Sequence, residues 1–124
     1  MKYRNRILNK ILRGKSLYAV GTIKIVAYLD LGTTPFIVML DNRAKINILH
    51  LSLAVKLGLT VTTLNYRYLA STNKLKSKFI EIVENTPVQV GGFHYKILFF
   101  VVNGEITQDC ILGRLFKMQA LVGY

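Results

Sequence analysis

Short runs of β-branched and aromatic residues, separated by turn signals, fill this chain from Leu17 onward and limit what it can fold into. Strands are predicted over 17–29, 36–40, 61–68, 75–83, 88–90 and 95–102. Gly and Pro mark the turns, with Pro35 before the second strand and Gly91-Gly92 before the last. The run Phe36–Leu40 is apolar throughout, which is typical of a strand buried on both faces.

Two short helices interrupt the strands. Leu49, Leu53 and Leu57 recur every four residues and Gly58 follows them, which predicts an amphipathic helix over 49–57 that ends at this glycine. A second helix is predicted over 114–119. Many short strands, two short helices and no βαβ rhythm indicate an all-β barrel or sandwich.

Composition places the chain among folded single domains. It has 124 residues, of which 52% are hydrophobic and 19% charged. Cys110 is the only cysteine, so no intramolecular disulfide forms, and a reducing cytosolic environment is expected. His50 and His94 are isolated surface candidates, and no metal or cofactor is expected. No apolar run reaches the roughly 18–20 residues of a membrane span.

The charge is strongly positive. Lys and Arg number 17 against six acids, a formal net charge of +11, which suggests an anionic partner such as nucleic acid. The same bias is also typical of a piece of a basic polyprotein. Residues 1–16 are read as a basic N-terminal extension before a domain over 17–124. The extension is either a linker or dimer-edge segment, or an Arg-rich targeting or membrane-surface helix.

Two segments resemble the retropepsins, the aspartic protease domains of retroviruses and LTR retrotransposons. Ile37–Leu49 (IVMLDNRAKINIL) with Leu53–Leu59 (LAVKLGL) is similar to the active-site strand and following helix. Cys110–Phe116 (CILGRLF) is similar to the motif that opens the C-terminal helix. The resemblance covers about residues 18–124 and is closest to Gypsy-type retrotransposon proteases. It implies a closed β-barrel with a flap hairpin and one or two short helices.

The resemblance also implies a site and a mechanism. Asp41 stands at the position of the catalytic aspartate, and two chains would pair so that their carboxylates share one proton. An extended peptide or polyprotein segment would be the substrate. The other implied positions are Asn42, Arg43 and Ala44 in the active-site loop, Ala70, Ser71, Thr72, Asn73 and Lys74 in the flap, and Ile111, Leu112 and Gly113 in the structural motif.

The motif departs from the family pattern at two positions. Asp-Asn-Arg-Ala replaces Asp-Ser/Thr-Gly-Ala, so Asn42 stands for a hydroxyl and Arg43 for the glycine. The long side chain of Arg43 would crowd the partner chain where glycine allows close approach. Its permanent charge would favour the ionised carboxylate and remove the shared proton. The domain is therefore predicted to be a weak or inactive protease.

Several candidate residues have a plainer interpretation. Asp41 could cap the turn after its strand. Lys74, Lys76 and Lys78 alternate, so they share one strand face and either line a peptide or RNA groove or form a solvated edge. Tyr66 and Tyr68 alternate likewise and either stack bases or pack on a half-buried strand.

Three functions remain open from the sequence. The first is a homodimeric retropepsin-like domain of a retrotransposon Gag-Pol polyprotein or a derivative gene, either active or a pseudoenzyme. It would lie in the cytoplasm or within a retroelement particle. The second is a basic β-barrel that binds nucleic acid. The third is a structural fragment without a selected activity.

Overall fold

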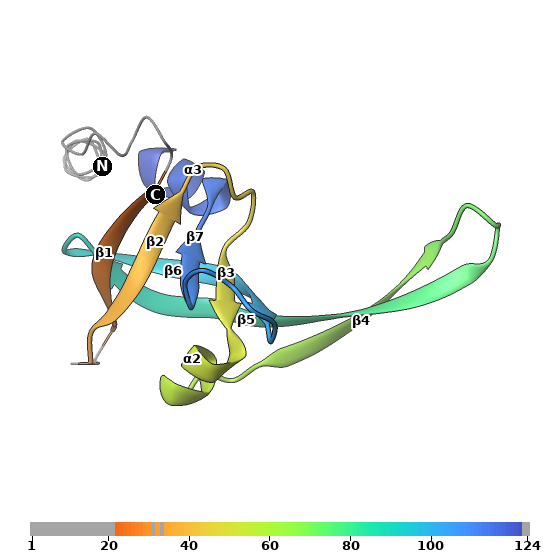
Figure 1. Cartoon of the computed structure of the whole chain (residues 1–124), viewed down its shortest axis with the longest axis horizontal. Helices are drawn as coiled ribbons and strands as arrows, with labels where there is room; N and C mark the ends of the chain where they lie inside the picture. Colours follow the sequence, from red (N-terminus) through yellow and green to blue (C-terminus); the bar gives the residue numbers. More distant parts are fainter. Residues whose placement is uncertain (1–21, 31, 33, 123–124) are drawn as a thin grey trace.

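The computed structural model describes residues 22–30, 32 and 34–122 (Figure 1). The elements in chain order are β1 (Thr22–Leu29), β2 (Phe36–Asp41), β3 (Ile48–His50), α2 (Leu51–Lys56), β4 (Thr62–Leu69), β5 (Leu75–Val90), β6 (Phe93–Val102), β7 (Cys110–Leu112) and α3 (Arg114–Val122). The predicted segment 1–16 and the first residues of the strand predicted over 17–29 lie outside the described residues.

The strands form one mixed sheet that closes on itself. Its order is β1-β2-β7-β3-β6-β5-β4, and β1 also pairs with β5, so every strand except β4 belongs to a ring. The β2–β7 and β3–β6 pairings are parallel, and the others are antiparallel. Closure leaves few free edges within the ring. The all-β class predicted from the strand pattern and the closed barrel with short helices implied by the family resemblance are both confirmed.

Side-chain alternation places one face of each strand inside the ring. In β1, Ile23 and Ala27 are buried while Lys24 is exposed. In β2, Val38 is fully buried, but Ile37 is 46% exposed, so the prediction of burial on both faces holds only in part. The core cluster unites residues of the strands of the ring with residues of both helices.

Helix α3 packs against the barrel through its buried side chains. Phe116 is 1% exposed and meets the ring of Tyr95 on β6 edge-on, with centroids 5.0 Å apart. Ala120 lies one turn further along the helix and is also fully buried. The opposite side of the helix is open, because Met118 is 64% exposed. The helix predicted over 114–119 is thus present and extends to Val122.

Helix α2 is shorter than its leucine pattern predicts. The helix begins at Leu51, and Leu49 and His50 instead belong to strand β3, which pairs with β6 and β7. Nδ1 of His50 accepts a hydrogen bond from the Ser52 N–H at 3.1 Å and so caps the helix. After the helix, Gly58 adopts a left-handed conformation with φ of 71°, as a glycine at this position does.

Strand β5 is continuous where two strands, 75–83 and 88–90, are predicted. Its ladder with β6 shifts register between Val83 and Thr86, and Asn85 takes a positive φ of 50°. This irregularity is a β-bulge that keeps the strand running through a polar stretch. The carbonyl of Pro87 accepts a hydrogen bond from the Asp30 N–H at 2.9 Å, so the proline does not end the sheet.

Smaller differences concern single residues. The sequence pattern places His94 in a turn, but it lies on β6, where it pairs with Gln89 and contacts the Asp30 carboxylate at 2.7 Å. Cys110–Leu112 forms a strand that was not predicted, because it is too short to show a strand pattern in the sequence. Lys74 lies in the hairpin turn, so only Lys76 and Lys78 stand on the strand itself. Among the described residues, no helix has the length and apolar character of a membrane span.

Strands β4 and β5 extend together as a long hairpin away from the ring (Figure 1). All residues of β4 are exposed, as are those of β5 from Leu75 to Phe79. The turn spans 70–74, where the Ala70 N–H donates to the Lys74 carbonyl at 3.0 Å. Asn73 takes the left-handed conformation that this turn requires, with φ of 59°. The hairpin predicted as a flap is therefore present.

The Phe116–Tyr95 contact predicts a stability difference between two positions of one helix. Phe116→Ala should lower the free energy of unfolding by about 3–5 kcal/mol, because it removes a large, fully buried side chain. Met118→Ala, on the exposed side of the same helix, should change it by less than about 0.5 kcal/mol. Urea denaturation followed by circular dichroism measures both; equal losses would show that α3 does not dock through Phe116.

Candidate active site

Asp41 is the last residue of β2 and lies where two strands meet in parallel. Leu40 pairs with Leu112 of β7, so the next residues along the two strands, Asp41 and Gly113, lie at the same level. The side chain of Asp41 is 13% exposed. The predicted catalytic residue is therefore partly buried at the edge of the barrel, and it lies beside the predicted Ile111–Gly113 motif.

The carboxylate of Asp41 is engaged by its own loop. Oδ1 accepts a hydrogen bond from the backbone N–H of Arg43 at 2.9 Å, and the Asp41 carbonyl accepts one from Ala44 at 3.2 Å. This arrangement is an Asx-type turn, the plainer role considered for Asp41. It also fixes the direction of the carboxyl group, as a catalytic carboxylate requires.

The Arg43 side chain adds a second contact to the same oxygen. Its Nε lies 3.3 Å from Oδ1 of Asp41, and the side chain is 70% exposed. The contact is an ion pair whose guanidinium is largely open to water, so the interaction is weak. The steric conflict predicted for Arg43 concerns a second chain and stays a prediction.

The loop after Asp41 is bound to the start of α3 by backbone hydrogen bonds. The Arg114 N–H donates to the Ala44 carbonyl at 2.8 Å, and the Leu115 N–H to the Lys45 carbonyl at 3.3 Å. Gly113 permits this approach, because a Cβ built there would lie 2.4 Å from the Ile46 carbonyl oxygen. Position 113 of the predicted motif therefore needs glycine, because a side chain there would collide with backbone carbonyl oxygens of the Asp41 loop.

Asn47 joins three segments of the site and was missed by the sequence analysis. It is 3% exposed, and its Oδ1 accepts a hydrogen bond from the Gly113 N–H at 3.0 Å. Its Nδ2 donates to the Leu98 carbonyl at 3.2 Å, and its own carbonyl accepts from Phe100 at 2.9 Å. The only signal was an amide among apolar residues in KINIL, which did not suggest a structural role.

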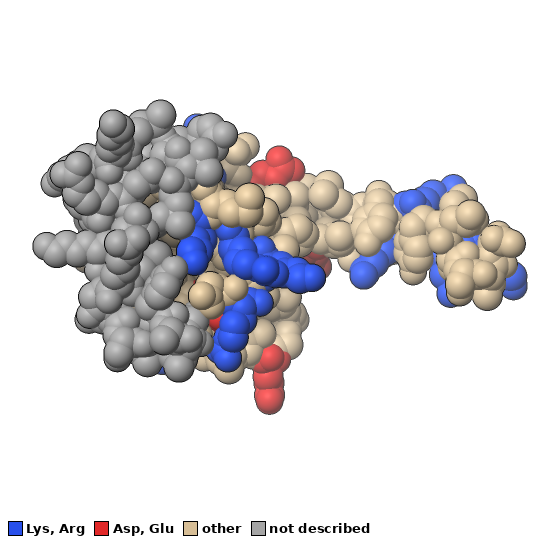
Figure 2. Space-filling model, turned by 90° about the horizontal axis from the view of Figure 1, so that it is seen from above, with Lys and Arg blue, Asp and Glu red and all other residues tan. Residues whose placement is uncertain are grey.

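Positive charge dominates the surface around Asp41. Arg43, Lys45 and Arg114 are exposed on the two segments that the backbone hydrogen bonds join. Figure 2 shows Lys and Arg side chains gathered over the body of the domain beside the hairpin, with more along the hairpin itself. An anionic group approaching this face would therefore be attracted, and a second positive surface repelled.

The predicted flap residues form the tip of the hairpin. Ala70, Ser71, Thr72, Asn73 and Lys74 make up the turn, and all of them except Ala70 are exposed. Within the described part of the chain, no hydrogen bond or ion pair joins the tip to the Asp41 loop. The structure thus brings Asp41, its loop and Gly113 together, and leaves the tip extended and apart.

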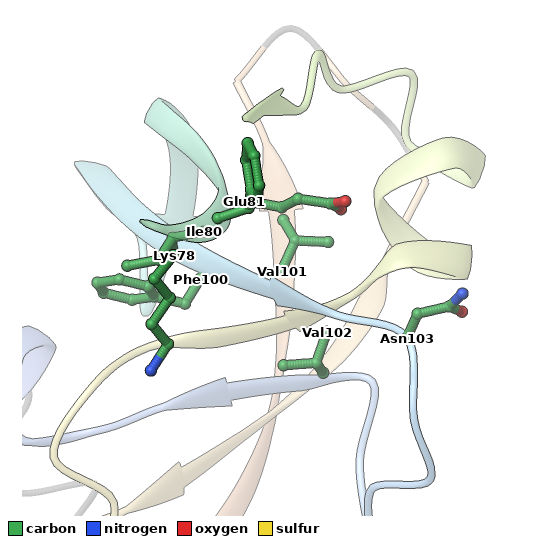
Figure 3. A pocket seen from close by; sticks show the side chains of 8 residues that line it. Lys78, Ile80, Glu81, Phe100, Val101, Val102 and Asn103 are labelled. Atoms are coloured by element: carbon green, nitrogen blue, oxygen red, sulfur yellow. The ribbon is translucent and has the colours of Figure 1, made fainter. Parts of the chain in front are cut away.

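A separate pocket lies at the root of the hairpin, with a volume of about 410 Å³. Figure 3 shows Lys78, Ile80 and Glu81 of β5 on one side and Val101, Val102 and Asn103 on the other. The pocket forms because β5 and β6 diverge beyond the Ile82–Phe100 pair. None of the residues that line it belongs to the Asp41 loop.

Other chemistry-bearing groups do not add to the site. Cys110 is buried, and burial, with a smaller contribution from the Asp109 charge, raises the pKa of its thiol far above the ordinary value. The thiol therefore stays protonated and is a poor nucleophile. In the described ranges, no three His, Cys, Asp or Glu side chains are grouped as a metal site would need.

Comparisons with known proteins agree with this geometry. The family model described as "Aspartyl protease" matches residues 26–116. Among solved structures, the chain is similar to the retroviral protease-like domain of Ddi1 from Leishmania major, with 16% identity and a TM-score of 0.53. That match covers 79% of this chain and 73% of the other, and it confirms the predicted retropepsin-like fold. None of the curated proteins matches.

The bridging role of Asn47 predicts a loss of stability on truncation. Asn47→Ala leaves the Gly113 N–H and the Leu98 carbonyl without their partner. The free energy of unfolding should fall by about 2–4 kcal/mol, since each unpaired buried polar group costs about 1–3 kcal/mol. Gln119→Ala removes an exposed side chain that donates to the Lys96 carbonyl and should cost less than about 1 kcal/mol. Similar losses in urea denaturation would contradict the bridge.

The close approach at Gly113 predicts a contrast between two glycines. Gly113→Ala should destabilise the fold by about 1–3 kcal/mol, because backbone carbonyls of the Asp41 loop must move to admit the methyl group. Gly104→Ala should change stability by less than about 1 kcal/mol, since nothing lies within 4 Å of a Cβ there. Thermal denaturation of both variants measures the difference, and a neutral Gly113→Ala would refute the packing argument.

Proposed function

This chain belongs to the aspartyl protease family, and on that premise we propose that it acts as a homodimer whose two Asp41 side chains meet on a shared axis. One chain supplies one such aspartate at the end of β2. Two carboxylates that close cannot both ionise, so the pair holds one proton and acts as both acid and base. A two-fold axis through the site is the simplest way to pair identical strand ends.

The ligand proposed for this dimer is an extended peptide. The β4–β5 hairpin is long and exposed, and its tip residues 70–74 would close over a peptide lying on the Asp41 face. Backbone groups of a hairpin edge bind extended peptides by strand pairing. The sequence resemblance supports a retrotransposon Gag-Pol polyprotein, or a gene derived from one, as the origin of the domain. It would then act in the cytoplasm or in a retroelement particle.

Peptide hydrolysis by this dimer is proposed to be weak or absent. The observation that carries this conclusion is the Arg43 side chain, whose Nε lies 3.3 Å from the Asp41 carboxylate. In the dimer, two guanidinium groups would face two carboxylates, and each would favour the ionised form. The shared proton would then be missing when the leaving group needs it. A side chain as long as that of Arg43 would also crowd a second chain that approaches where the family has glycine.

Replacement of Asn42 and Arg43 by the family residues tests the proposal. Asn42→Ser with Arg43→Gly should raise peptide cleavage at least about 10²-fold over the wild-type chain, since a positioned general acid–base contributes roughly 10²–10⁴-fold. Cleavage by the revertant should itself be faster near pH 4–5 than at pH 7, because the proton shared by the two carboxylates is lost as the pH rises. Cleavage of a peptide library across this pH range measures both effects.

Matched variants separate charge, space and fold. Arg43→Gln removes the charge but keeps bulk, whereas Lys45→Gln removes an equal exposed charge from the same loop without touching Asp41. Asp41→Asn in the revertant background should abolish all cleavage. Robust Asp41-dependent cleavage by the wild-type chain would refute the weak-enzyme proposal. A revertant that stays monomeric in sedimentation experiments and cleaves nothing would refute the homodimer.

A further inference from the structure

The outer hairpin has a composition unlike that of a simple substrate cover. From Thr62 to Ile80 it carries four cationic residues, Arg67, Lys74, Lys76 and Lys78, and no acidic residue. The first acidic residue after this stretch is Glu81. Its surface is exposed throughout β4 and along β5 to Phe79. An isolated arm with only positive charge is a favourable place for a polyanion.

The strand register places tyrosines and lysines on one face of this arm. Tyr66 lies directly opposite Lys78, and Tyr68 directly opposite Lys76. Directly opposed residues, and residues two apart on one strand, point to the same side of the sheet. We call these four residues the tyrosine–lysine face.

The opposite face has a different character. Arg67 pairs with Ser77 there, and Leu69 pairs with Leu75. Phe79 also lies on this side and is 67% exposed. Both faces belong to the same hairpin, and each has an exposed aromatic ring and a cationic side chain. Phe79 and Arg67 therefore serve as control positions for the tyrosines and lysines of the other face.

The rings of the tyrosine–lysine face are open to a ligand. Tyr66 and Tyr68 are 40% and 42% exposed, and their centroids lie 6.0 Å apart at an interplanar angle of 44°. Because the rings are tilted, neither covers the other's face. Each ring therefore retains a surface on which a flat group can stack.

We propose that the tyrosine–lysine face binds single-stranded nucleic acid. The two tyrosines stack on successive bases, and Lys76 and Lys78 beside them contact the phosphates. Alternating aromatic and cationic groups are the combination by which proteins bind single strands without reading sequence. This site shares no residue with the Asp41 loop, so it does not depend on the proposed function.

Neighbouring features limit the site and favour this ligand. Lys78 and Ile80, on the tyrosine–lysine side, line the pocket at the hairpin root together with Phe79 and Glu81 of the opposite face (Figure 3). Glu81, the first acidic residue of β5, lies on the opposite face, so the tyrosine–lysine face itself carries no acidic residue between Tyr66 and Ile80. An acidic peptide would satisfy the lysines but supplies no regular row of flat groups for the two rings. A single strand of nucleotides supplies both.

The stacking part is tested with the full chain and fluorescein-labelled oligothymidylate and oligouridylate of about 16 nucleotides, near the upper end of known site sizes. Fluorescence anisotropy should give measurable binding to both strands. Tyr66→Ala should weaken binding at least about fivefold, while Tyr66→Phe keeps the ring and should retain it. Phe79→Ala, the matched aromatic change on the opposite face, should have less than a twofold effect.

The phosphate contacts are tested by salt dependence. For single strands, the slope of log affinity against log salt becomes shallower by about 0.7 for each phosphate that the protein no longer neutralises. Lys78→Gln should produce this change, and Arg67→Gln, which removes an equal charge from the other face, should produce less than half of it. Asp41→Asn should leave both affinity and slope unchanged.

Three results would overturn the proposal. The first is equal loss of binding in Tyr66→Ala and Phe79→Ala, which would show that no specific face is used. The second is equal affinity for duplex DNA, which offers phosphates but no open bases. The third is competition by polyglutamate at matched charge, which would identify the arm as a general polyanion or acidic-peptide site.

Discussion

The buried amide of Asn47 holds together the part of the molecule in which the candidate site lies. It accepts from Gly113, donates to Leu98 and, through its backbone, accepts from Phe100. Three segments that are far apart in sequence are thereby fixed: the loop after Asp41, the end of β7 and the middle of β6. An amide suits this task because it carries a donor and an acceptor on one side chain. The loop that follows Asp41 is thus held to β6 and β7 by a residue that takes no part in the proposed chemistry.

The contrast between Asp41 and Asn47 shows how far sequence reasoning reaches in this chain. Asp41 and Gly113 were identified because the short motifs around them, IVMLDNRA and CILGRLF, resemble those of a known family at matching positions. Both depend on local patterns, which are visible in one dimension. Asn47 acts through partners 51 and 66 positions away, and no local pattern records such partners. The all-β class and the two short helices followed from strand number and periodicity, and the closed barrel followed from the family resemblance. Strand β3, in contrast, lies inside a leucine repeat that is typical of a helix.

The remaining differences between the predicted and observed strands depend on how neighbouring strands pair. The polar residues before Pro87 suggested a break in β5, but a bulge absorbs them and the ladder with β6 resumes at Thr86. Propensity cannot distinguish a bulge from a turn, because both favour residues such as Asn85 that accept a positive φ. The strand Cys110–Leu112 is equally hidden: it is only three residues long and forms because β2 and β3 lie on either side of it.

The unbroken course of β5 has a mechanical consequence. One end of this strand pairs with β1 inside the ring, and the other reaches the tip of the arm. The arm and the barrel are therefore joined by one continuous strand, with no loop between them. A force on the arm is transmitted along this strand to the barrel. Strand β5 can bend at the bulge after Val83, because the ladder of hydrogen bonds with β6 is interrupted there. Bending at this bulge would change the angle of the arm without breaking the pairing of β5 with β1.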